Sequence, residues 1–145
     1  MAETIGFLLN KIVTEQFAVI ESAFKDGDDV QFGINSKYGI FDDEKVLSVF
    51  IAPAFYQNKQ PFLVLEVICH FEIEESAWNE FLNKDKSKLT FPLNFVRHVT
   101  MLAVGTARGI LHAKTENTPF NEFILPTINL NETIKSSVVF NLSED

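Results

Sequence analysis

The sequence predicts an α+β fold: a four-stranded antiparallel sheet, followed by a long helix and a short C-terminal element. Three observations predict it. Four strand-like segments come first and are mostly joined by short links, and a single long stretch with helical spacing follows them. The length, 145 residues, is common for one domain. Strands followed by a helix are typical of α+β folds, so we expect a single domain over residues 1–145, with a loose tail from about residue 136.

The first two strands are expected at Phe17–Phe24 and Val30–Asn35. The first is rich in β-branched and aromatic residues, and the second alternates apolar and polar residues. An Asp- and Gly-rich turn signal over residues 26–29 separates them. The second strand should therefore have one buried face.

The third strand, Val46–Phe55, is apolar on both faces, which indicates a central position or cover on both sides. The fourth, Pro61–Glu74, is the longest and has two distinct faces. One face is fully apolar: Leu63, Leu65, Val67, Cys69, Phe71 and Ile73. The other mixes apolar and acidic residues: Phe62, Val64, Glu66, Ile68, His70 and Glu72. The short links between the last three strands favour antiparallel neighbours.

The long helix should begin near Pro92, which suits a first helical turn, and end near Lys114. Its apolar stripe is too wide for the sheet alone to cover, so another subunit is expected on its second side. Gly105 and Gly109 would let a neighbouring backbone approach closely. Before this helix, Ser76–Asn83 is expected to form one or two helical turns, and after it Leu125–Asn129 should be extended.

Composition and motifs favour a binding protein over an enzyme. The formal net charge of −8 disfavours nucleic acid and anionic membranes, and no apolar run reaches membrane-spanning length. A single cysteine and an acidic N-terminus favour a cytoplasmic location. His70, His98 and His112 lack metal-site spacing, and nucleotide-binding glycine motifs are absent. We therefore expect no catalytic residue, no metal, no cofactor and no membrane insertion.

Three dipeptides in order carry a resemblance to a known family: Phe91-Pro92 at the start of the helix, Arg108-Gly109 near its end, and Leu125-Pro126 after it. With the strands that precede them, they resemble the SecB family of protein-export chaperones. The segment 91–130 is most similar, 7–17 is also similar, and Leu65-Glu66-Val67 matches weakly. The resemblance implies a homotetramer, a dimer of dimers, that holds unfolded polypeptides in hydrophobic grooves without ATP. It also implies delivery of these clients to the translocation motor SecA through acidic residues on the sheet.

Three sets of site residues follow from the pattern and the resemblance together. The client-binding set is Phe32, Ile34, Val64, Trp78, Phe81 and Leu82. The acidic docking set is Glu66 and Glu72. The oligomer-interface set is Phe95, Val99, Leu102, Thr106, Arg108 and Gly109.

Alternatives stay open for several of these residues. Trp78, Phe81 and Leu82 can instead cap the core, and Arg108 can order the loop after the helix or interact with the last helical carbonyls. At the level of function, the alternatives are a dedicated chaperone of one partner, such as an antitoxin, and a plain protein-interaction module. An enzyme is the least favoured class, since it needs a pocket with convergent polar groups.

Overall fold

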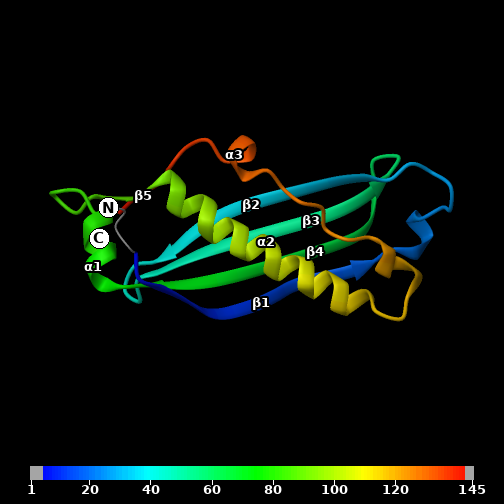
Figure 1. The fold of residues 1–145 in the computed structure, drawn as a ribbon, viewed down its shortest axis with the longest axis horizontal. Coiled ribbons are helices and arrows are strands. Elements are labelled where there is room, and N and C mark those ends of the chain that lie inside the picture. The colour runs from blue at the N-terminus through cyan, green and yellow to red at the C-terminus, as the bar shows by residue number, and fades with distance from the viewer. Residues whose placement is uncertain (1–4, 143–145) are drawn as a thin grey trace.

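The computed structural model describes residues 5–142 and confirms the predicted fold class. Its main sheet contains β1 (Phe7–Val19), β2 (Gln31–Phe41), β3 (Val46–Gln57) and β4 (Gln60–Ile73), in the order β1-β4-β3-β2. All three strand pairs are antiparallel. The long helix α2 (Leu93–Thr115) lies diagonally across one face of this sheet and contacts β3 and β4 (Figure 1). The molecule thus has two layers.

Shorter elements complete the ends of these layers. The turn η1 (Glu21–Ala23) follows β1, and the helix α1 (Glu75–Phe81) follows β4. The strands β5 (Lys88–Phe91) and β6 (Val138–Asn141) pair antiparallel in a second, two-stranded sheet. The turn η2 (Pro119–Glu122) and the short helix α3 (Leu130–Thr133) lie between α2 and β6.

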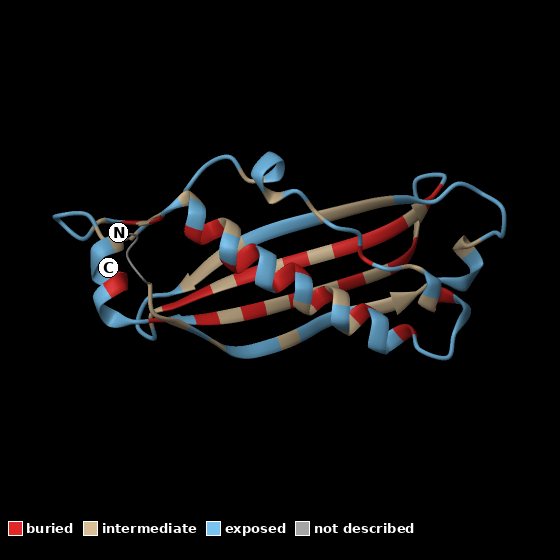
Figure 2. Ribbon diagram, in the orientation of Figure 1, coloured by how far each residue is buried: buried red, intermediate tan, exposed pale blue. Residues whose placement is uncertain are grey.

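The core lies between α2 and the sheet face that the helix covers, which we call the inner face (Figure 2). The apolar face of β4 predicted from the sequence is this inner face, and its six residues are at most 2% exposed. Val96, Val99, Ala103 and Ala107 of α2 pack against it and are fully buried. Tyr38 and Thr100 add a polar contact between β2 and α2, with 2.6 Å between their hydroxyl oxygens.

The first strand was expected at Phe17–Phe24, but β1 spans Phe7–Val19 and the chain has left the sheet by Glu21. Two register shifts explain the difference. They fall at Asn10 and at Glu15, where β1 has one extra residue relative to β4. Each extra residue reverses which positions face the core, so no single alternation runs along the strand.

Two further boundaries differ from the prediction. The second strand continues to Phe41 instead of ending at Asn35, although Lys37 and Gly39 interrupt its apolar pattern. The tail expected to be loose from about residue 136 contains β6, because Val138–Asn141 pairs with β5, a partner about fifty residues away in sequence. Residues 143–145 of that tail lie outside the described part of the chain.

Candidate functional site

The first candidate surface is the face of the sheet opposite α2, which we call the outer face. The strand register assigns its side chains in five rows across the sheet. The rows, read from β2 to β1, are Gly33, Ala54, Val64, Ala18; Asn35, Ala52, Glu66, Gln16; Lys37, Phe50, Ile68, Val13; Gly39, Ser48, His70, Lys11; and Phe41, Val46, Glu72, Leu8. Because α2 and the segment after it lie on the inner side, no described helix covers these rows (Figure 1).

The centre of the outer face combines aromatic side chains with a polar pair. The Nζ of Lys37 lies 4.9 Å from the centroid of the Phe50 ring, a cation–π distance. In the next row the Ser48 Oγ lies 2.7 Å from the Nδ1 of His70. The ring of Phe41, which is 53% exposed, lies 5.9 Å from the His70 ring. This region can contact apolar groups of a partner while offering a few polar atoms.

The pKa of His70 is lowered from its ordinary value, chiefly by burial and further by the charge of Lys11, while Glu15 opposes the shift. His70 is therefore neutral at neutral pH. A serine–histidine pair can serve nucleophilic catalysis, but acyl transfer also needs donors for an oxyanion. Ser48 lies on β3, a strand paired on both sides, so its neighbouring backbone N–H groups are used in the sheet. The pair is better understood as a polar spot on a binding surface.

Both residues of the acidic docking set lie on the outer face, as their strand positions predicted. Glu66 is half-buried, and Glu72 is exposed and accepts a hydrogen bond of 3.1 Å from the Nδ2 of Asn10. Val64 of the client-binding set lies on the same face, two residues from Glu66 along β4. The structure therefore brings these three predicted residues onto one surface.

The rest of the client-binding set lies elsewhere. Phe32 and Ile34 face the inner side of β2, where Ile34 lines a hollow that Ile128 also lines. Trp78 is 2% exposed and packs edge-on against the Phe91 ring at 5.8 Å. This placement corrects the expectation that Trp78 meets a client and agrees with its interpretation as a cap on the core.

Phe81 and Leu82 continue the same cap. The Phe81 ring lies 5.3 Å from Phe91 and 5.7 Å from Phe95, and Leu82 forms a β-bridge with Leu89. Both are half-buried, so only their outer edges reach solvent. The client-binding set therefore does not form one continuous groove.

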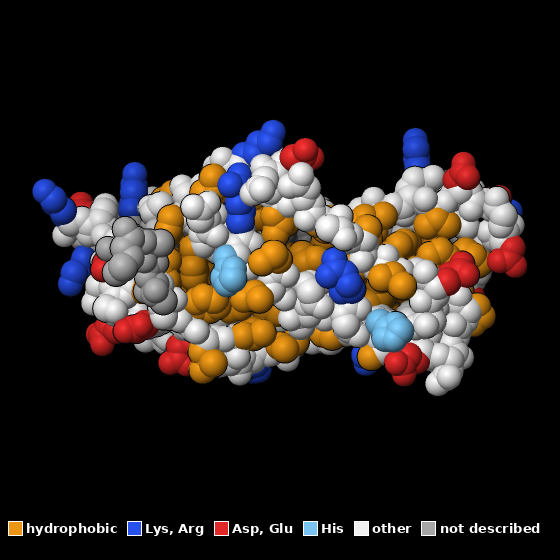
Figure 3. Space-filling model, viewed as in Figure 1, with side chains coloured by type: hydrophobic (Ala, Val, Ile, Leu, Met, Phe, Trp, Pro, Cys, Tyr) orange, Lys and Arg blue, Asp and Glu red, His pale blue; other side chains and the backbone are white. Residues whose placement is uncertain are grey.

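A second candidate surface is the solvent-facing stripe of α2. Met101 is 55% and Leu102 36% exposed, and an added Cβ at Gly105 or Gly109 would meet nothing within 4 Å. The stripe comprises Asn94, His98, Met101, Leu102, Gly105 and Gly109, and none of them is an acid, a lysine or an arginine. Figure 3 shows hydrophobic side chains gathered over this side, with most charged groups toward the margins. A helix face of this kind suits close packing against another helix.

The oligomer-interface set divides between this stripe and the core. Leu102 and Gly109 are exposed, and Thr106 is half-buried, with its hydroxyl donating to the Leu102 carbonyl at 2.9 Å. Phe95 and Val99 are 5% and 0% exposed, which corrects the expectation that they meet another subunit. Both fall on the side of the wide apolar stripe that the chain's own sheet covers.

Two arginines of α2 hold the C-terminal segment against the helix. Arg108 donates from Nε to the Leu125 carbonyl and from Nη2 to the Pro126 carbonyl, both at 2.9 Å. This agrees with the interpretation that Arg108 orders the loop after the helix. Arg97 holds a later part of the C-terminal segment, since its Nε donates to the Ile134 carbonyl at 2.9 Å. The sequence analysis missed Arg97, although its spacing of eleven residues from Arg108, about three helical turns, places both on one side of the helix.

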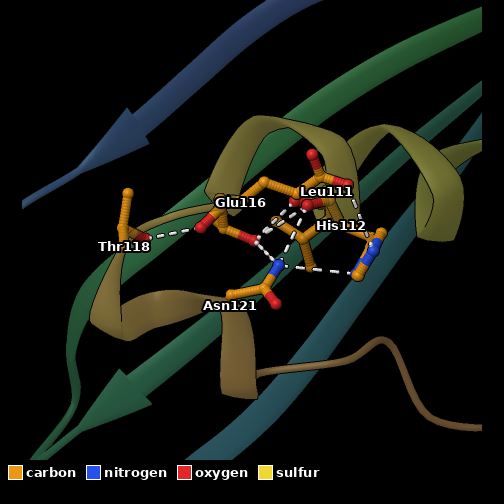
Figure 4. Close-up of polar contacts among 6 residues, drawn as sticks. Leu111, His112, Glu116, Thr118 and Asn121 are labelled. Atoms are coloured by element: carbon orange, nitrogen blue, oxygen red, sulfur yellow. Dashed lines mark hydrogen bonds and ion pairs between the residues drawn. The ribbon is translucent and has the colours of Figure 1, made fainter.

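The end of α2 contains a polar cluster that we interpret as structural (Figure 4). Asn121 donates from Nδ2 to the His112 carbonyl at 3.0 Å, and Thr118 donates from Oγ1 to the Thr115 carbonyl at 2.7 Å. These bonds satisfy carbonyls that lack partners at a helix end. His112 and Glu116 form a 3.5 Å pair with both side chains more than half exposed. The cluster turns the chain from α2 into η2.

The described residues lack two other features. Among residues 5–142, no group of three or more His, Cys, Asp or Glu side chains is placed to hold a metal ion. In the same part of the chain, no helix has both the length and the apolar character needed to span a membrane.

Comparisons with known proteins place the chain in no established family. No family model matches it, and no curated protein does. Among solved structures it is similar to the crystal structure of a protein of unknown function from Streptococcus agalactiae, with 11% identity and a TM-score of 0.36. The match covers 88% of this chain and 99% of the other. A similarity at this level establishes neither a shared fold nor a shared function.

Proposed function

We propose that this protein binds other polypeptides and acts as an ATP-independent chaperone for unfolded chains. The observation that carries the proposal is the outer face, where about half of the side chains are apolar and no described helix covers them. Two large apolar side chains of this face, Leu8 and Phe41, are 62% and 53% exposed, and apolar groups gathered on one uncovered face are a feature of interaction surfaces. The resemblance to SecB in the 91–130 segment supports the same proposal, as does the sheet-and-helix plan that this resemblance implies.

The physical basis of binding is burial of client apolar side chains, at roughly 25 cal/mol per Å². Phe41, Phe50 and Ile68 offer such contacts on the outer face. Individual contacts of this kind are weak, and a client that wraps around several of them gains avidity. Release then needs no nucleotide, because each contact dissociates separately.

Self-association through α2 is the second part of the proposal. The stripe around Leu102, Gly105 and Gly109 presents apolar and small groups that a second helix can approach closely. We propose a dimer of dimers in which these helices meet, so that the outer faces of the sheets remain free for clients. For a role in export, we propose that the protein delivers its clients to SecA in the cytoplasm through Glu66 and Glu72.

The test combines function and mass. A refolding model protein is allowed to aggregate with and without the chaperone, in the absence of nucleotide, and the chaperone's mass is measured by sedimentation. Suppression near one tetramer per client supports the proposal. A monomer with no effect on aggregation contradicts it and favours a plain interaction module, while suppression for one co-purifying partner alone favours a dedicated chaperone.

A further inference from the structure

A hollow on the outer face follows from the missing side chain of Gly39. On β2 this glycine lies between Lys37 and Phe41, and its cross-strand partner is Ser48. A Cβ added at Gly39 would meet nothing within 4 Å, so the space above the backbone is open. The side chains of Phe41, Phe50 and Ser48 line this hollow.

The charge at this hollow is opposite to that of the molecule. The chain carries a formal net charge of −8, yet the residues lining the hollow include Lys37 and no carboxylate. Glu66 and Glu72 of the same face lie on β4, outside this lining. A partner at the hollow therefore meets an apolar space with one cation at its edge.

The spacing along β2 defines what can occupy it. Lys37 and Gly39 are two residues apart on one face of a strand, and side chains two positions apart in an extended peptide also point to one side. If a partner peptide places an apolar side chain over Gly39, between the rings of Phe41 and Phe50, then its side chain two positions away lies over Lys37. A carboxylate there pairs with the Lys37 ammonium.

We propose that this hollow docks an extended segment of a partner protein in which an aromatic or branched apolar residue lies two positions from an aspartate or glutamate. This inference goes beyond chaperone activity, because it concerns one defined motif. Binding of that motif does not require suppression of aggregation, so the two proposals fail separately.

The test uses two fluorescein-labelled peptides, GSTFTEGSG and GSTFTKGSG, and fluorescence anisotropy with the full chain. Wild type is expected to bind the glutamate peptide about fivefold more tightly than the lysine peptide, as for an exposed ion pair. Lys37→Glu should reverse this preference. Lys114→Glu makes the same charge change on α2, and should leave the preference unaltered.

A second variant tests the hollow itself. Gly39→Ile places a branched side chain in the hollow, where its Cβ meets nothing within 4 Å, and isoleucine is favoured in strands, so the fold should be kept, as thermal unfolding can verify. This variant should lose at least fivefold in affinity for the glutamate peptide. Equal affinities of wild type for the two peptides, or unchanged binding by Gly39→Ile, would overturn the proposal. A lower mass of Gly39→Ile in sedimentation would also overturn it, since a second copy would then occupy the hollow.

Discussion

The two faces of β4 show how differently one strand can be used. Leu65, Val67 and Phe71 on the inner face are at most 1% exposed, because α2 covers them. Ile68 on the outer face is also apolar but only half-buried, and no described helix lies over it. The inner face therefore contributes folding stability, whereas half-buried apolar residues on the outer face contribute less to it. The difference teaches that burial within one chain explains the apolar residues of the inner face but not those of the outer face.

The largest expected effect is on the free energy of unfolding, and it comes from one substitution on each face of β4. Phe71→Ala removes a fully buried ring and should lower the free energy of unfolding by about 3–5 kcal/mol. Ile68→Ala removes a half-buried side chain and should cost about 1 kcal/mol or less, while weakening aggregation suppression. Urea denaturation at low protein concentration measures both. Equal losses for the two variants would show that the outer face is covered in solution, which would remove the distinction between the faces.

The cover of the inner face depends on α2 and on the segment that Arg108 holds. Arg108→Ala removes two hydrogen bonds to the Leu125 and Pro126 carbonyls and should cost about 1–3 kcal/mol. Hydrogen exchange should become faster in residues 123–128 before it does in β3 or β4. Arg108→Lys is the matched control, since it keeps the charge but cannot donate in the same fork, and should recover only part of the loss. Exchange unchanged in that segment would contradict the positioning role.

The same comparison explains how far the sequence could predict the structure. The inner face of β4 was assigned correctly because a covered face selects apolar side chains at every second residue. The start of β1 was expected ten residues too late, at Phe17 instead of Phe7, because the bulges at Asn10 and Glu15 reverse the alternation twice. An edge strand with little cover also tolerates exposed apolar groups such as Ile12, which is 48% exposed.

The candidate site was predicted in part for similar reasons. Glu66 and Glu72 stood out as acids on an apolar strand, and both lie on the outer face. Phe95 and Val99 could not be separated from Leu102 by apolarity alone, since a wide stripe does not say which side the sheet covers. The hollow at Gly39 needed the pairing of β2 with β3, because Phe41 and Phe50 come together only through that register.

A smaller effect should distinguish the two sides of α2. Gly105 is exposed with open space around it, so Gly105→Ala should stabilise the separate monomer by about 0.5–1 kcal/mol through helix propensity. In an assembly where helices pack at this glycine, the added methyl group should weaken association. Thermal unfolding of dilute protein and sedimentation at higher concentration measure the two effects. A gain in stability with unchanged mass would contradict packing at Gly105.

The smallest expected effect concerns His70 on the outer face. Its pKa is lowered in the folded protein by burial and by Lys11, so below an ordinary histidine pKa of about 6.5 the unfolded chain binds this proton more readily than the native state. The free energy of unfolding should therefore decrease as the pH falls from about 6.5 toward the folded pKa. Since His70 is half-exposed, solvent screening keeps the change below about 1 kcal/mol.

An NMR titration of the His70 ring measures the shift itself, and its midpoint should lie below that of the unfolded chain. His70→Gln should remove this part of the pH dependence in urea denaturation. A His70 midpoint at or above the ordinary value would mean that Glu15 outweighs Lys11 and burial. The centre of the outer face would then be charged in mildly acidic solution, and an apolar client would have to displace a solvated imidazolium to bind there.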